Sequence, residues 1–244
     1  MYKRQQLNDK PGWYRIAPHV HTVHSDGRLT PAEVIALGKA SGLDGIVSTD
    51  HNTTSALLHW GEVQDPEFLV INGVEVTYGQ GHWNIFGLDP HAWIDFRIHH
   101  NDTLRYRKAV AKARKAGRLL VANHPYNLDF LYDVTPMDGI EVWNSAWSPA
   151  NERAVELWHT LLVGGNRKFA VASTDFHRGG NIASPHTVVR AEALSAEAVI
   201  DAIAAGRSYV ARDTSVEIGM QVRNSATPVQ HADIGDTLLR SGGM

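Results

Sequence analysis

The chain has 244 residues, 43% of them hydrophobic, with a formal net charge of −3 and no cysteine. This length suits one large domain, or a domain with a small appendage, and the charge argues against a protein that holds duplex nucleic acid or an anionic membrane. Without cysteine there is no thiol nucleophile and no cysteine-ligated zinc, so any metal needs histidine and carboxylate ligands. The start of the chain lacks a signal-peptide core and no apolar run approaches membrane-spanning length, so we expect a soluble, cytoplasmic protein.

Strand and helix patterns alternate along most of the chain. The strand patterns cover residues 14–21, 45–52, 68–77, 82–87, 119–125, 139–144, 169–177 and 186–191. The helix patterns cover residues 30–42, 102–117, 150–165 and 195–206. This order predicts a parallel sheet with helices outside it, except that residues 82–87 follow a short turn and are expected to return as a hairpin. About seven strands favour a distorted β/α barrel over an open sheet.

Two helices carry further signals. Thr30, Pro31 and Glu33 fit a capping box with proline at the first helical position. The helix at 102–116 is basic on its outer faces, which is typical of a solvated helix and less specifically of a phosphate-attracting patch.

Residues 1–211 form the predicted barrel, preceded by a polar lead-in at 1–13. Residues 212–244 are polar and contain glycine, with one possible strand at 216–222. We expect this C-terminal extension to be the start of a truncated β module.

Chemically reactive side chains fall at the ends of successive predicted strands. They are His19, His21, His51, Glu75, His124, Asp175 and His177. His19 and His21 are two apart in a strand, so they point the same way, and the following turn brings in Asp26. The carboxyl ends of parallel barrel strands share one face, where active sites are built, so these residues predict a metal site.

The motifs also resemble a known family. H-V-H-T-V-H-S-D-G at 19–27, T-D-H-N at 49–52, G-V-E-V-T at 73–77, G-H-W-N at 81–84, N-H-P at 123–125 and S-T-D-F-H at 173–177 are similar to the PHP (polymerase and histidinol phosphatase) superfamily of metallohydrolases. The G-H-W-N and E-V-W-N segments resemble its carbaryl-hydrolase-like (CehA/McbA) branch. The resemblance covers roughly residues 15–211 and implies a distorted seven-stranded barrel that holds two or three divalent ions, Zn, Mn or Fe.

The resemblance also implies a ligand set. The first metal would take His19, His21, Glu75 and Asp175; the second would share Glu75 and add His82 and His124; the third would take Asp26, His51 and His177. His82 has the least fixed spacing, and Asn84 or water would replace it if it points away. His24 is expected to face outward, and a structural role is kept for His59, His91, His99, His100, His159, His186 and His231.

The expected chemistry is hydrolysis by a metal-bridging hydroxide, with no covalent intermediate because the chain lacks a G-x-S-x-G elbow and any thiol. Glu75, Asp175 and His177 would act in catalysis, Arg178 would clamp an anionic substrate, and Asp50 would orient a ligand imidazole. Trp83, Trp143 and Trp147 are candidates for either the pocket wall or the core.

Three functions stay open at this point. The first is a phosphoesterase for a small phosphorylated metabolite or nucleotide, including trimming of short nucleotide ends. The second is a carbamate or aryl-ester hydrolase, whose pocket should be mainly apolar where a phosphate pocket should offer a cation. The third is a metal-binding module without turnover. The sequence leaves the oligomeric state open.

Overall fold

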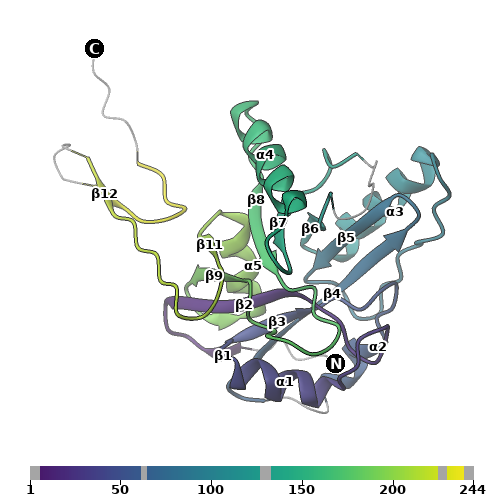
Figure 1. Ribbon diagram of the computed structural model, residues 1–244, viewed down its shortest axis with the longest axis horizontal. Coiled ribbons are helices and arrows are strands. Elements are labelled where there is room, and N and C mark those ends of the chain that lie inside the picture. Colours follow the sequence, from purple (N-terminus) through teal and green to yellow (C-terminus); the bar gives the residue numbers. More distant parts are fainter. Residues whose placement is uncertain (1–5, 62–64, 127–132, 225–229, 239–244) are drawn as a thin grey trace.

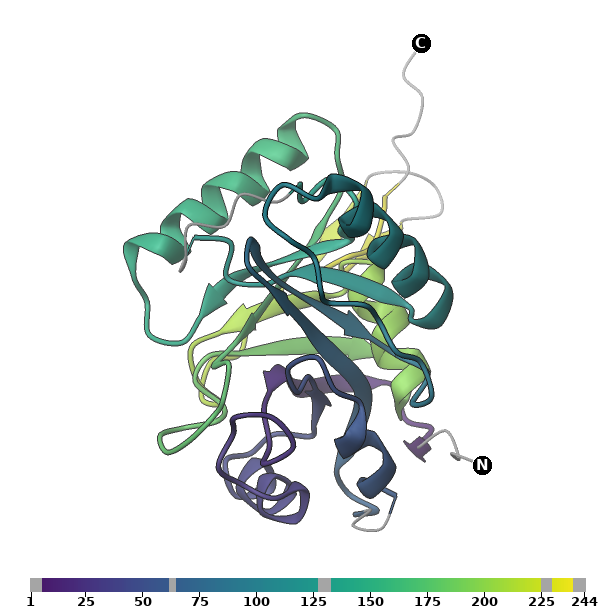
Figure 2. The ribbon, with the colours of Figure 1, turned by 90° about the vertical axis from the view of Figure 1, so that its right-hand side faces the viewer.

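The protein is built around one strongly curved mixed sheet with most of its helices on the outside (Figures 1 and 2). The computed structural model describes residues 6–61, 65–126, 133–224 and 230–238. Within these ranges, nine strands are hydrogen bonded in the order β11-β9-β2-β3-β4-β5-β6-β7-β8. Two smaller pairs, β1 with β10 and β12 with β13, lie outside this sheet.

The strands of the main sheet are β2 (Gly12–Val20), β3 (Gly45–Ser48), β4 (Leu69–Tyr78), β5 (Gly81–Phe86), β6 (Leu119–Ala122), β7 (Gly139–Asn144), β8 (Phe169–Ser173), β9 (His186–Ala191) and β11 (Ser208–Ala211). The short strands are β1 (Gln6–Asn8), β10 (Leu194–Ser195), β12 (Val222–Arg223) and β13 (His231–Ala232). The helices are α1 (Pro31–Ala40), α2 (Ser55–His59), α3 (Thr103–Ala116), α4 (Pro149–Val163) and α5 (Ala196–Ala204).

The sheet curls until the end of β8 meets the end of β2. Val20 forms a parallel bridge with Phe176, and the backbone N–H of His21 donates to the carbonyl of Phe176 at 2.8 Å. Ser173 Oγ accepts from the His19 N–H at 3.1 Å and donates to the His19 carbonyl at 3.0 Å. These bonds make the sheet a nearly closed barrel, which confirms the predicted fold class.

Alternation along the strands sorts apolar side chains into two layers. Leu69 and Val121 pack inside the barrel in one cluster with Ile203 of α5, whereas their neighbours Val70 and Leu120 join a second cluster under the outer helices. The inner cluster, with α5, fills the N-terminal end of the barrel. The side chains that continue the inner face toward the other end of the strands therefore lie on a closed apolar floor.

The sheet differs from a purely parallel one in two places. β5 is antiparallel to β4 and β6, and β9 is antiparallel to β2 and β11. Tyr78 pairs with Gly81, so only two residues connect β4 to β5, too few for a parallel crossover. The predicted hairpin return at 82–87 is thus confirmed. β9 and β11 extend the sheet beyond β2, so the described residues form nine strands, of which the seven from β2 to β8 lie between the two ends that meet.

The capping box predicted for α1 is confirmed, and two further helices have side-chain caps. The Thr30 hydroxyl accepts from the backbone N–H of Glu33, and the Glu33 carboxylate accepts from the backbone N–H of Thr30 at 2.8 Å, so the capping box of α1 is complete. Asp102 caps α3 through the backbone N–H of Arg105, and Ser195 caps α5 through that of Ala198. These bonds satisfy donors that the first helical turn leaves without partners.

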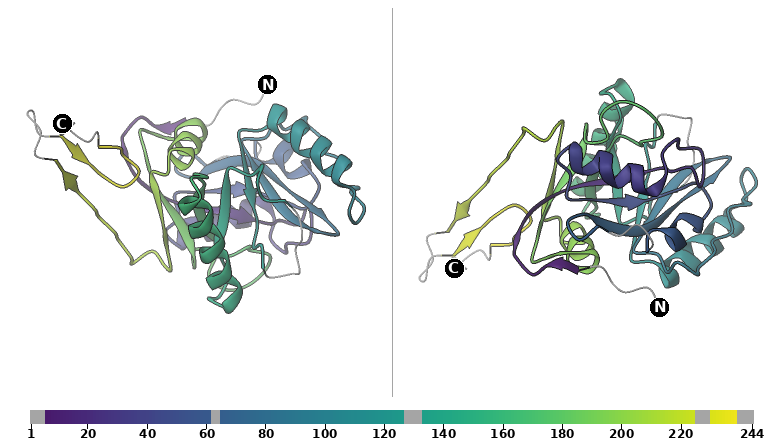
Figure 3. Two further views of the ribbon diagram at one scale, coloured as in Figure 1. Left: turned by 90° about the horizontal axis from the view of Figure 1, so that it is seen from above. Right: turned by 90° about the horizontal axis from the view of Figure 1, so that it is seen from below.

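The strand predicted at 216–222 is largely wrong, because only Val222 of this range is in a strand. Ile218 and Met220 are exposed, so their side chains gain little burial from any neighbouring element in the described structure. The ribbon of β12 and β13 projects from the barrel (Figure 3). Parts of the predicted lead-in and extension, at 1–5, 225–229 and 239–244, lie outside the described residues. No helix in the described part of the chain is both long and apolar enough to cross a membrane.

The inner apolar layer predicts a large effect of truncation in α5. Ile203 is fully buried in that layer, so Ile203→Ala should lower the free energy of unfolding by about 2–5 kcal/mol. Urea denaturation measures this loss. Leu104→Ala on α3 is the control, because Leu104 is 64% exposed and its truncation should change stability by no more than about 0.5 kcal/mol. Equal losses in both variants would contradict the assignment of α5 as the barrel floor.

Candidate metal centre

The predicted ligands lie at the end of the barrel opposite α5. Glu75 follows Leu69 and Ile71 on the inner face of β4, and Asn123 follows Leu119 and Val121 on that of β6. The same alternation that builds the apolar floor therefore places polar side chains above it. All nine predicted ligands fall into groups whose ligand atoms lie within 4.8 Å of one another: His19, His21, Asp26, His51, Glu75, His82, His124, Asp175 and His177.

Glu75 is fully buried at the centre of these residues. Its Oε2 lies 3.3 Å from His19 Nε2, 3.3 Å from His21 Nε2 and 2.8 Å from His51 Nδ1. Its Oε1 faces the other side, accepting from Asn123 Nδ2 at 2.7 Å. The two oxygens thus face different sets of imidazoles, as a carboxylate shared by two cations must.

The predicted first group, His19, His21, Glu75 and Asp175, is assembled as expected. Asp175 Oδ1 lies 3.1 Å from His19 Nε2 and 3.0 Å from His21 Nε2. These three atoms are buried, and the described residues give none of them a well-formed hydrogen bond. Polar atoms that converge in this way fit a divalent ion, since two imidazole nitrogens and carboxylate oxygens are a common ligand set for Zn, Mn or Fe.

The predicted second group is less compact than the first, because its two histidines fall into different clusters. His82 Nδ1 lies 3.1 Å and His124 Nε2 lies 3.5 Å from Glu75 Oε1. His82 points into the centre from β5, so Asn84 is not required in its place. However, His82 clusters with His51 and Glu75, whereas His124 clusters with His19 and Glu141.

The predicted third group lies nearer the surface. Asp26 Oδ1 is 3.2 Å from His177 Nε2, and Asp26 Oδ2 is 3.6 Å from His51 Nε2. His177 Nδ1 donates to the backbone carbonyl of Asp175 at 2.7 Å. Because a carbonyl only accepts, this bond leaves Nε2 unprotonated in the neutral ring and directed at the group.

Charge explains the ionisation of this centre without metal. Burial alone would raise the pKa of Glu75, but the imidazoles around it, His19 first, hold that pKa well below its usual range. Burial opposes a charge on His19, but Asp175, Glu75 and Glu141 together raise its pKa well above the usual value. Burial dominates at His21 and lowers its pKa. Burial and the surrounding carboxylates thus shift the pKa values of these two adjacent imidazoles in opposite directions.

Other predicted residues take different places. Asp50 accepts from the backbone N–H of Thr22 at 2.8 Å and from Ser25 Oγ at 2.7 Å, so its described bonds go to the ligand-bearing turn rather than to an imidazole. Arg178 is exposed beside His177. His24 is half-buried, lies 2.9 Å from Ser55 Oγ and belongs to none of the ligand groups.

The three tryptophans separate into two roles. Trp83 is fully buried among the residues of the outer apolar layer, so it belongs to the core and not to a pocket wall. Trp143 and Trp147 form an edge-to-face pair with centroids 5.0 Å apart. Ser145, between them, donates from its Oγ to the carbonyl of Thr174 at 2.6 Å, which places this aromatic pair next to the segment that carries Asp175.

The sequence reasoning missed Glu141. This residue is 2% exposed on β7, with Oε1 3.1 Å from His19 Nδ1. A signal was present, since G-I-E-V at 139–142 places a carboxylate inside an apolar strand in the same way as G-V-E-V at 73–76. A buried carboxylate requires a partner, which here is a predicted metal ligand.

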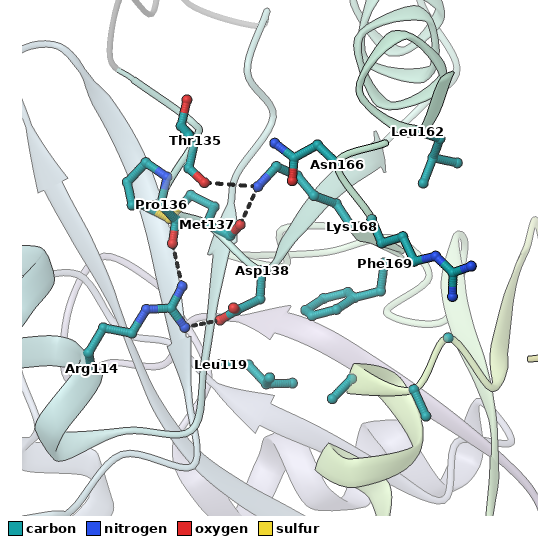
Figure 4. Close-up of a pocket in the computed structure, with 14 residues that line it drawn as sticks. Arg114, Leu119, Thr135, Pro136, Met137, Asp138, Leu162, Asn166, Lys168 and Phe169 are labelled. Atoms are coloured by element: carbon teal, nitrogen blue, oxygen red, sulfur yellow. Dashed lines mark hydrogen bonds and ion pairs between the residues drawn. The ribbon is translucent and has the colours of Figure 1, made fainter. Parts of the chain in front are cut away.

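A separate cavity of about 720 Å³ opens at the other end of the barrel (Figure 4). Its lining includes Leu119, Met137 and Phe169, with Lys168 donating to the carbonyls of Thr135 and Met137. None of the predicted ligands lines it. The catalytic hypothesis therefore rests on the ligand groups and not on this cavity.

Comparisons with known proteins bear on the fold. A two-domain protein from Bacteroides vulgatus that contains a predicted PHP-like metal-dependent phosphoesterase matches with a TM-score of 0.62 and 20% identity, over 87% of this chain and 70% of that one. PsfC from Pseudomonas syringae matches with a TM-score of 0.63 and 17% identity, over 84% of this chain and 93% of that one. An amidohydrolase from Chromobacterium violaceum, with bound sulfate and no metal, matches with a TM-score of 0.54 and 19% identity, over 68% of this chain and 89% of that one.

No protein family and no curated protein matches the sequence. At identities this low, the solved structures establish a shared architecture. The chain therefore has the barrel fold of PHP-like phosphoesterases.

The ligand geometry predicts that divalent ions stabilise the folded protein. An ion that binds only the native state adds about 2.7 kcal/mol at a concentration of 100 Kd, so Zn or Mn should raise the Tm of chelator-treated protein by several degrees. Asp175→Asn should remove most of this rise, because it replaces a carboxylate shared by His19 and His21. Differential scanning fluorimetry measures both effects. A metal-induced rise of the same size in Asp175→Asn would remove Asp175 from the ligand set.

Proposed function

We propose that this protein is a metal-dependent phosphoesterase that hydrolyses a small phosphorylated metabolite or nucleotide. The observation that carries this proposal is the set of adjoining ligand groups around Glu75, whose two oxygens face different imidazoles. Divalent ions held there would activate water for attack and neutralise charge on the phosphoryl oxygens. Two or three ions fit the residues, and Zn, Mn and Fe are all compatible with them.

The chain's own residues would hold and orient the reacting groups. Glu75 and Asp175 supply the negative charge that keeps cations at the barrel mouth. His177, fixed by its bond to the Asp175 carbonyl, presents Nε2 toward Asp26 at the more exposed edge. This edge is where a substrate would enter, since Asp26 is 58% exposed whereas Glu75 is fully buried.

Cations near the mouth favour a phosphate over a neutral ester. Arg178 directly follows His177, and the backbone N–H of Arg28 donates to the His177 carbonyl at 2.8 Å. Two exposed arginines thus have their backbones next to one predicted ligand, His177. Guanidinium groups bind phosphate oxygens in pairs, so either arginine could clamp the substrate anion.

A second candidate is carbamate or aryl-ester hydrolysis on the same centre. The Trp143–Trp147 pair favours it, because an aromatic pair beside the mouth suits an aryl group. The sequence resemblance to the carbaryl-hydrolase-like branch points the same way. The structural neighbours support both candidates, since one contains a predicted phosphoesterase and another is an amidohydrolase with bound sulfate.

A paired hydrolysis assay separates these candidates. Metal-loaded protein should release nitrophenol from a nitrophenyl phosphate, and a chelator should abolish the release. Release only from a nitrophenyl ester or naphthyl carbamate would replace the phosphoesterase proposal with the second candidate. Absence of release from all of them, with metal bound, would favour a binding module.

The role of Arg178 can be tested separately. Arg178→Ala should lower kcat/KM for the phosphate substrate by about 10–100-fold, the loss typical of one charge-assisted contact to an anion, with little change in Tm. Arg167→Ala is the matched control, because Arg167 is an exposed arginine at the far end of the barrel. If both variants retain wild-type kcat/KM, Arg178 does not contact the substrate.

A further inference from the structure

Glu141 lies beneath the predicted ligands but does not belong to the predicted ligand set. Its two oxygens take different partners: Oε1 lies 3.1 Å from His19 Nδ1, and Oε2 accepts from the backbone N–H of His124 at 3.0 Å. Oε2 also accepts from Asn144 Nδ2 at 3.1 Å. One buried carboxylate therefore holds two of the predicted ligands at once.

We propose that Glu141 is a positioning residue that fixes the ring of His19 and the backbone of His124 for metal binding. This inference rests on the metal centre of the proposed function and adds a residue to its supporting structure. Glu141 acts through the two histidines and does not itself contact the ion.

The contact with Glu141 sets the tautomer of His19. An ionised carboxylate only accepts, so the contact with Glu141 places the proton of a neutral His19 ring on Nδ1. Nε2 is then free to bind a cation, and it is the atom that faces Glu75 at 3.3 Å and Asp175 at 3.1 Å. A carboxylate behind a ligand histidine also raises the basicity of the ring, which strengthens its bond to a metal.

Glu141 also holds the backbone of His124. This residue has φ of 24°, a conformation that side-chain-bearing residues rarely adopt, and it precedes Pro125, which further restricts it. The hydrogen bond from its N–H to Glu141 offsets part of the resulting strain. His124 Nε2 is thereby held 3.5 Å from Glu75 Oε1 and 3.7 Å from Asp175 Oδ2.

Glu141 is itself held in place. Asn144 donates to it, and the Asn144 backbone N–H donates to Asn151 Oδ1 at 3.0 Å near the start of α4. Glu141 is thus bonded through three donors, two of which belong to predicted ligands. These three contacts compensate the buried carboxylate without a cation of its own.

The competing possibility is that Glu141 is a ligand. The ligand atoms of His19, His124 and Glu141 lie within 4.8 Å of one another, which would admit an ion among them. That ion would have to take His19 Nδ1 or displace its contact with Glu141. The number of ions bound at saturation separates the two roles, because loss of a ligand removes a site whereas loss of a positioning residue weakens one.

Glu141→Gln tests the proposal. The amide has one acceptor and one donor, so it cannot accept from both His19 Nδ1 and the His124 N–H in the wild-type arrangement. Metal affinity, measured by competition with a chelator, should fall about 10–100-fold, while the ion content at saturation, measured by mass spectrometry, stays at the wild-type value. Unchanged affinity, or loss of an ion at saturation, would overturn the proposal.

Asp138→Asn is the matched control. Asp138 directly precedes β7, its carboxylate accepts from the Leu120 backbone N–H at 2.8 Å, and it pairs with Arg114 (Figure 4). This variant disturbs a carboxylate next to the start of the same strand, at the other end of the barrel. It should lower Tm while leaving the chelator-competition affinity within about twofold of wild type. An affinity loss equal to that of Glu141→Gln would assign both effects to general destabilisation and overturn the proposal.

A measurement on the wild-type protein needs no variant. In zinc-loaded protein, the ring ¹⁵N signals of His19 should show the proton on Nδ1, and a proton on Nε2 would overturn the proposal. If the wild-type protein binds no divalent ion, the proposed function fails together with this inference. If it binds ions and Glu141→Gln binds them equally well, only the inference fails.

Discussion

The barrel is organised around a buried negative charge. Glu75 is fully enclosed, and a carboxylate in such a place is tolerated only when cationic or hydrogen-bonding groups surround it. His19, His21, His51 and His82 approach it to between 2.8 and 3.3 Å from three segments of the chain. The contacts that compensate the charge of Glu75 thus hold the ends of several strands together. The same surroundings would accept divalent ions, since cations meet the need of the carboxylates better than imidazoles alone.

The apolar half of the barrel makes this arrangement possible. The inner layer and α5 pack together at one end, so the polar side chains toward the other end adjoin buried apolar side chains. Low dielectric strengthens each contact between the carboxylates and the imidazoles, and it makes an unpartnered member costly. This explains why the supporting bonds from Asn123, Ser173 and Glu141 are themselves buried.

Much of this arrangement was predictable from the sequence. Strand alternation and the position of His, Asp and Glu at strand ends predicted that most of these side chains share one face, and the resemblance to the PHP superfamily added His82 and the grouping. The short turn predicted the hairpin, and the capping box predicted the start of α1. These signals are local or periodic, so a single sequence contains them. Their roles as metal ligands stay predictions.

The failures have a common cause in long-range contacts. Glu141 looked like a strand residue because its partners, His19 and His124, are remote in sequence or bonded through the backbone. Asp50 was expected against an imidazole, but the turn at Thr22 and Ser25 folds back onto it first. The place of β9 beside β2 depends on how the barrel closes, and no local pattern encodes that. Trp83 could have faced either side until the register of β5 was known.

The seam between β2 and β8 has a consequence for how the protein folds. His19 and Ser173 lie 154 residues apart and bond to each other there, so closure requires both of these distant segments. A growing polypeptide can form β2 to β6 and bury much of their apolar surface, but it lacks Asp175 and His177 until β8 arrives. Docking of β8 against β2 thus brings the ends of the barrel together and completes the set of predicted ligands in one event. Because such distant contacts form slowly, a nascent chain passes through a period in which several strands have paired but the predicted ligand set is still incomplete.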